Sequence, residues 1–89
     1  MIILDGSAMA DRAAMHVELK RKLDLPDYYG ANLDALNDCL GERRERELIV
    51  IERAGAFLEG CGDYGLRLLS LFGEHGLQVL LDCEWLLTS

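Results

Sequence analysis

The chain has 89 residues, of which 51% are hydrophobic and 28% charged, and 16 acidic against 9 basic residues give a formal net charge of −7. This length predicts a single domain, 1–89, and excludes a second one. The composition is that of a globular protein rather than a disordered one. Because the negative charge repels nucleic acid and anionic lipid, we expect a cationic protein partner, without direct contact to RNA or to a membrane.

Nothing in the sequence marks export, membrane insertion or cofactor binding. No apolar run approaches the roughly 20 residues of a membrane span, and residues 1–6 lack the basic region and cleavage site of a signal peptide, so we expect a cytoplasmic protein. Cys39, Cys61 and Cys83 are widely spaced and form no C-x-x-C or Cys/His pattern. We therefore interpret them as reduced apolar residues and expect no disulfide, no metal and no cofactor.

The first part of the chain predicts a strand and then a helix. Residues 2–4 are apolar and end at the turn signal Asp5-Gly6, which is typical of a buried strand. Asp11 is a candidate N-cap of the following helix, and Glu18 is expected on its solvated face. The predicted inward stripe is Met15, Leu19 and Leu23. Pro26 prevents the helix from continuing.

The second half predicts helices between two further strands. Residues 48–51 form a continuous apolar run, typical of a strand covered on both faces. Residues 53–62 are weakly helical, with inward candidates Ala54, Phe57 and Leu58. Asp63 is a candidate cap of the next helix, and the residues expected to pack inward from it are Leu66, Leu69 and Phe72, joined by Leu68 or Leu71.

Residues 77–81 predict a third strand, and the tail 82–89 either extends it or turns back so that Trp85 covers apolar surface. Strands separated by helical segments need crossover connections, so the sheet is expected to be parallel. The predicted fold class is therefore α/β, with helices packed on a three-stranded parallel sheet.

The stretch 23–42 concentrates negative charge, with no lysine or arginine between Lys22 and Arg43. A loop with two tyrosines leads into a helix that Asn32 is expected to cap and Gly41 to end. The acidic residues of the stretch are Asp24, Asp27, Asp34, Asp38 and Glu42. Residues three and four apart are neighbours on a helix, so Asp34, Asn37 and Asp38 share one face.

These residues have structural interpretations beside functional ones. A carboxylate at Asp34 stabilises the positive helix end by ~0.3–1 kcal/mol, whereas Asp38 lies beyond the first turn and four residues from a like charge, which a partner would explain. The alternative is a solvated face that tolerates a small repulsion. Tyr29 is expected to fill the core and Tyr28 to be the exposed contact. Gly30 either adopts a positive φ angle or lets a partner approach the backbone.

Catalysis finds little support in the sequence. His16 has no serine, cysteine or acid arranged around it by spacing, so we interpret it as a packed or surface histidine. Asp34 and Asp38 could form a glycosidase pair, but both stand on one exposed helix, whereas hydrolases hold two carboxylates across a cleft. No loop has the oxygen spacing of a calcium site. We expect no enzyme and no catalytic residue.

Residues 23–40 closely resemble the signature of the barstar family, intracellular inhibitors of barnase-type ribonucleases, in the proline, the Tyr28-Tyr29-Gly30 loop and the register of Asp34 and Asp38. The similarity extends more loosely over the whole chain. The resemblance implies a three-stranded parallel sheet flanked by four helices. It also implies a ribonuclease inhibited 1:1, through an acidic helix and loop that take the place of RNA phosphates in its active site.

The resemblance implies roles for single residues. Asp38 resembles the central acid that replaces a substrate phosphate, Tyr28 the ring that covers a nuclease histidine, and Asp34 a second anion facing basic side chains. Glu74 resembles a peripheral acid on the last helix. The predicted partner-binding set is Tyr28, Tyr29, Gly30, Asn32, Asp34, Asn37, Asp38, Gly41, Glu42, Arg43 and Glu74.

The chain departs from the family pattern at Asn37 and Arg43, which stand where the best-known member carries interface aromatic residues. We therefore expect a target other than barnase itself: a basic, extracellular, barnase-like ribonuclease or a related nuclease toxin, bound by a chain that is monomeric when free. The alternatives are an immunity protein against a different nuclease toxin, and a small enzyme that uses Asp34 and Asp38.

Overall fold

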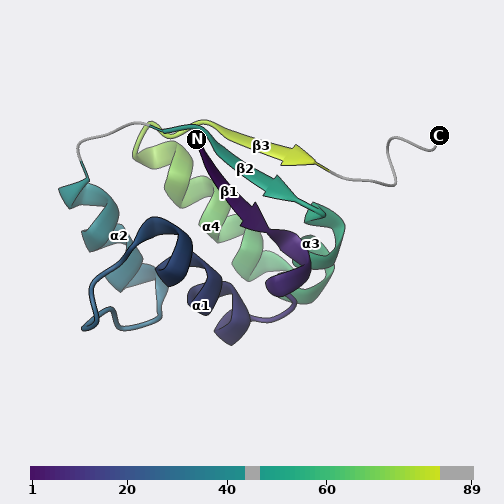
Figure 1. The fold of residues 1–89 in the computed structure, drawn as a ribbon, viewed down its shortest axis with the longest axis horizontal. Helices are drawn as coiled ribbons and strands as arrows, with labels where there is room; N and C mark the ends of the chain where they lie inside the picture. The colour runs from purple at the N-terminus through teal and green to yellow at the C-terminus, as the bar shows by residue number, and fades with distance from the viewer. Residues whose placement is uncertain (44–46, 83–89) are drawn as a thin grey trace.

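The computed structural model describes residues 1–43 and 47–82. Its elements are β1 (Ile2–Asp5), the 3-10 turn η1 (Gly6–Ala8), α1 (Arg12–Leu23), α2 (Leu33–Glu42), β2 (Ile49–Glu52), α3 (Ala54–Cys61), α4 (Asp63–Glu74) and β3 (Val79–Asp82). The strands form one parallel sheet in the order β1-β2-β3, with the helices gathered on one side of it (Figure 1). The predicted α/β class with a three-stranded parallel sheet and four helices is confirmed.

The core lies between the sheet and the helices. Side chains alternate along a strand, and the rows that the register aligns toward the helices are Ile2, Ile49 and Val79, then Leu4, Ile51 and Leu81. Helix residues complete this core at helical spacing, chiefly Met15, Leu19, Leu36, Leu40, Phe57, Leu68 and Phe72. The inward stripe predicted for α1 is therefore confirmed.

Among the described residues no helix covers the other face of the sheet, which corrects the expectation that residues 48–51 are covered on both faces. Val50 is only half-buried, and its neighbours in the register, Ile3 and Leu80, are exposed, Leu80 by 56%. The apolar run predicted a strand correctly. It could not show that the helices pack on one side alone.

Glu18 is buried rather than solvated, with only 3% of its surface exposed. One carboxylate oxygen accepts a hydrogen bond from the backbone N–H of Asp5 at 2.9 Å, and the other pairs with Arg21 at 2.8 Å. Burial alone would raise the pKa of Glu18, but the bonds from Arg21 and Asp5 outweigh it, so the pKa is lowered. Glu18 thus fastens the end of β1 to α1.

Two caps were predicted correctly and one wrongly. Asp11 accepts a hydrogen bond from the N–H of Ala14 at 2.8 Å, as an N-cap does. Asn32 caps α2 in the same way. Asp63 is instead the first residue of α4, and the cap position is Gly62, whose φ of 53° suits glycine.

Two further expectations need correction. Helix α2 runs one residue past Gly41, to Glu42. Leu66 is exposed, because α4 turns Gly65, Leu68 and Phe72 toward the core instead.

Cys39 and Cys61 are free thiols. Cys83 and Trp85 lie outside the residues described, and in the described part no helix is long and apolar enough to cross a membrane.

Candidate functional site

The loop before α2 is fixed by its own backbone and by Asn32. The N–H of Tyr29 donates to the carbonyl oxygen of Pro26 at 2.9 Å. The Asn32 side chain accepts from the N–H of Ala35 at 2.7 Å and donates to the carbonyl oxygen of Gly30 at 3.2 Å. One amide therefore caps the helix and holds the loop. Its predicted contact with a partner stays a prediction.

The positive φ angle of this loop belongs to Ala31, at 53°, and not to Gly30. That interpretation of Gly30 was wrong. A Cβ built on Gly30 would instead lie 3.3 Å from the amide nitrogen of Asn32, a crowded approach to the bond that fixes the loop. Glycine is therefore favoured at position 30 because a larger side chain would crowd the side chain of Asn32.

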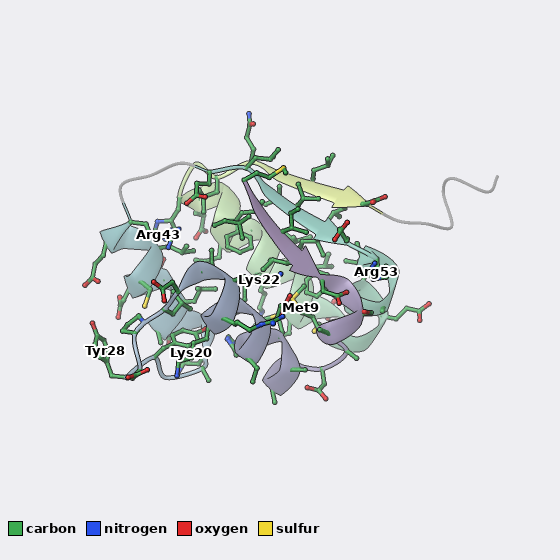
Figure 2. The ribbon with its side chains drawn as sticks, viewed as in Figure 1. Met9, Lys20, Lys22, Tyr28, Arg43 and Arg53 are labelled. Atoms are coloured by element: carbon green, nitrogen blue, oxygen red, sulfur yellow. The ribbon has the colours of Figure 1, made fainter. Side chains whose placement is uncertain are left out.

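The loop and α2 enclose a groove of about 360 Å³, here called the loop groove. Its walls are Tyr28, Tyr29, Gly30, Ala35, Asp38, Cys39 and Glu42, five of which belong to the predicted set. Tyr28 is 82% exposed and Tyr29 only 9%, so the predicted core position of Tyr29 and the exposure of Tyr28 are confirmed, while their contact with a partner stays a prediction. Figure 2 shows Tyr28 at the margin of the molecule.

On its other side α2 borders a second groove, of about 500 Å³, here called the α2–α4 groove. It is lined by Leu33, Asp34, Asn37, Leu66, Arg67, Ser70, Leu71 and Glu74. The fold thus brings Glu74 into one groove with Asp34 and Asn37, although it lies far from both in sequence. The oxygen of the Asn37 amide is 2.8 Å from Nε2 of His75, which joins α2 to the residue that follows α4.

The acids of both grooves lack side-chain partners among the residues that the structure describes. Asp34, Asp38, Glu42 and Glu74 are exposed, and no side chain in the described ranges forms a hydrogen bond or ion pair with them. Burial raises the pKa of the Cys39 thiol, and the negative charges of Glu42 and Asp38 raise it further. The described acids therefore give the surface around α2 an anionic character, and Arg67 lines the α2–α4 groove beside Asp34 and Glu74.

Arg43 is half-buried and bound within its own chain. Its guanidinium donates to the carbonyl oxygen of Leu23 at 2.8 Å and pairs with Glu47 at 2.9 Å. Arg43 and Gly41 line neither groove, so their predicted part in partner binding stays a prediction. The charged residues Arg44, Glu45 and Arg46, which follow Arg43 in the sequence, lie outside the described residues.

Several groove residues were missed by the sequence analysis. Ala35 and Cys39 are absent from the predicted partner-binding set, yet both line the loop groove. Arg67 and Ser70 lie seven and four residues before Glu74 and so share its helix face. That spacing was the signal available once Glu74 had been singled out. No local signal in the sequence predicted the contact between His75 and Asn37.

The chain matches a family model across most of its length and a known protein over a shorter part. The family model described as "Barstar (barnase inhibitor)" matches residues 1–82. A protein of Bacillus subtilis (strain 168), named "Putative ribonuclease inhibitor YrdF", is 59% identical over 39 residues. That match covers 44% of this chain and 43% of the relative, so the aligned part spans less than half of either sequence.

Proposed function

Because this chain belongs to the barstar family, we propose that it inhibits a microbial ribonuclease of basic charge by filling its active site in a 1:1 complex. The family description and the name of the Bacillus relative support a ribonuclease-inhibitor role. The active-site mechanism and the class of target are the further content of the proposal, and they rest on the anionic surface around α2.

The observation that carries the proposal is the state of Asp38. Its carboxylate is exposed, lines the loop groove beside Tyr28 and Glu42, and has no partner in the described part of the chain. A ribonuclease active site binds a phosphate with cationic side chains. It can therefore supply the cationic partners that Asp38 does not have among the described residues. Once enclosed by the nuclease, a charge at the centre of the contact carries much of the affinity.

The other predicted residues surround Asp38 in a way that suits this contact. Tyr28 offers an aromatic face that a nuclease side chain can cover. On the other side of α2, Asp34 and Glu74 place two more carboxylates at the α2–α4 groove, where they would face basic residues on the rim of the active site. Such complementarity accelerates association and orients the partner.

The alternatives fit these observations less well. Asp34 and Asp38 line different grooves and both are exposed, whereas a hydrolytic pair faces one enclosed substrate. An immunity protein against another nuclease toxin would use the same anionic surface, and the choice of nuclease separates it from the main proposal.

The test is a titration of ribonuclease activity with the purified chain. A secreted, basic, guanyl-specific microbial ribonuclease is mixed with increasing chain, and cleavage of RNA is followed. Loss of activity that is complete near one chain per enzyme supports the proposal. A DNase toxin titrated in parallel tests the immunity alternative. Full cleavage at excess chain, with every such ribonuclease tried, contradicts the proposal, and RNA cleavage by the chain alone would support an enzyme.

A further inference from the structure

A buried run of hydrogen bonds lies behind the loop that carries Tyr28. His16 of α1 is only 3% exposed, and its two ring nitrogens both face hydroxyl groups. Nδ1 lies 2.5 Å from the hydroxyl of Tyr29 in the loop, and Nε2 lies 2.7 Å from the hydroxyl of Tyr64 on α4. One imidazole therefore joins α1, the loop and α4.

The run has a direction because neutral imidazole has one N–H and one lone pair. One tyrosine hydroxyl must donate to the ring and the other must accept from it, so the two bonds depend on one proton. Burial lowers the pKa of His16 and keeps the ring neutral. Burial, then Tyr64 and Cys39, raises the pKa of Tyr29, which keeps that hydroxyl protonated.

No carboxylate among residues 1–43 and 47–82 forms a hydrogen bond or an ion pair with His16. The ionisable groups that interact with the run are Tyr29 of the loop, Tyr64 of α4, Cys39 of α2 and Arg12 of α1, whose guanidinium lies 4.5 Å from the centre of the Tyr64 ring. None of these is negative at neutral pH. A second proton on His16 would add positive charge near Arg12, and both hydroxyls would then have to accept.

We propose that His16 and Tyr64 are positioning residues for the binding surface, holding Tyr29 and therefore the loop of Tyr28 and Gly30 in the shape that meets the partner. This inference rests on the proposed function. Tyr28 is exposed and cannot order the loop itself, whereas Tyr29 is buried and joined to two helices through His16. A loop that is ordered before binding loses less conformational entropy when the partner arrives.

The first experiment requires no partner. Tyr64→Phe keeps the ring under Arg12 and removes only the hydroxyl bound to Nε2. We expect the amide of Tyr29, which donates to Pro26, to exchange with solvent about 3- to 10-fold faster, the effect of losing one buried hydrogen bond. Tyr28→Phe removes a hydroxyl that has no partner in the described residues and should leave this exchange unchanged. Unchanged exchange in Tyr64→Phe would overturn the inference.

The second experiment measures binding across pH. Tyr64→Phe should raise the inhibition constant about 3- to 10-fold against the ribonuclease that the unmodified chain inhibits. His16→Gln keeps one donor and one acceptor but does not titrate, so the affinity it retains should decline less below pH 6.5 than that of the unmodified chain. Identical pH profiles and an unchanged inhibition constant would overturn the positioning role.

The two proposals fail separately. If the unmodified chain inhibits no ribonuclease, the proposed function falls, while amide exchange still decides whether Tyr64 holds the loop. If the unmodified chain inhibits and Tyr64→Phe behaves like it in exchange and in binding, only the positioning role falls.

Discussion

Asp38 is an exposed carboxylate without a partner in the part of the chain that the structure describes, and this makes its substitution informative. Asp38→Ala should raise the dissociation constant for the target ribonuclease at least 30-fold, about 2 kcal/mol or more, because the enclosed charge would be lost from the centre of the contact. Binding is measured by calorimetry or by inhibition of RNA cleavage.

The same variant should keep its stability. Asp38 lies four residues from Asp34, so removing one of the two like charges changes the free energy of unfolding by no more than ~0.5 kcal/mol. Glu59→Ala is the matched control: it removes one exposed acid from α3, outside both grooves, and should leave binding unchanged. Equal affinity for Asp38→Ala and Glu59→Ala would exclude Asp38 as the central acid.

Glu18 allows a prediction on stability and pH. Glu18→Ala leaves the N–H of Asp5 without its acceptor and should lower the free energy of unfolding at pH 7 by about 1–3 kcal/mol. Because the pKa of Glu18 is lowered on folding, its contribution is complete above the ordinary value of 4.5 and is lost as pH falls through the lowered value.

Urea denaturation at pH 7 and at pH 3 checks this expectation. The difference in free energy of unfolding between Glu18→Ala and the unmodified chain should shrink at the lower pH. At pH 3 Glu18 is protonated in the unfolded chain, so folding with a charged Glu18 requires the loss of that proton. Glu59→Ala, which removes an exposed carboxylate from α3, should show little difference at either pH. A gap for Glu18→Ala that stays constant would contradict the assigned role.

At the scale of the element, α2 and its loop depend on the cap at Asn32. Asn32→Ala removes the acceptor for Ala35 and the donor to Gly30, and should lower the free energy of unfolding by ~0.5–2 kcal/mol. It should also weaken inhibition, since the loop that presents Tyr28 loses a restraint.

The chain offers a matched control on another helix. Asp11 caps α1 with a bond of 2.8 Å, and Asp11→Ala should cost a similar free energy of unfolding without changing inhibition. Thermal denaturation and the inhibition assay are run on both variants. If the two caps weaken inhibition equally, general destabilisation explains the effect and the loop has no special part in it.

At the scale of the whole molecule, the formal net charge of −7 and the acids around α2 should govern the rate of association. Raising the salt concentration from about 0.05 to 0.5 M should slow association with a basic ribonuclease roughly tenfold or more and change dissociation much less. Stopped-flow mixing measures both rates. Salt-independent association would contradict a contact steered by charge.

Much of the fold could be predicted because its signals are local. Residues 2–4 and 48–51 show the composition of strands, Asp11 and Asn32 have the chemistry of caps, and Pro26 cannot continue a helix. These properties act over one or two turns of chain. The predictions at Glu18, Leu66 and Asp63 failed because burial and helix starts there depend on what packs against them.

The site divides in the same way. By itself the sequence determined the acidic stretch around α2 and the exposed Tyr28, since neighbouring residues set these, whereas the structure divides Asp34 and Asp38, expected on one helix face, between two grooves. Only the tertiary structure decided that Glu74 shares a groove with Asp34, that Arg43 binds Leu23 and Glu47, and that His16 joins Tyr29 to Tyr64. The reason is physical: such contacts arise from the packing of segments distant along the chain, which residue spacing does not encode.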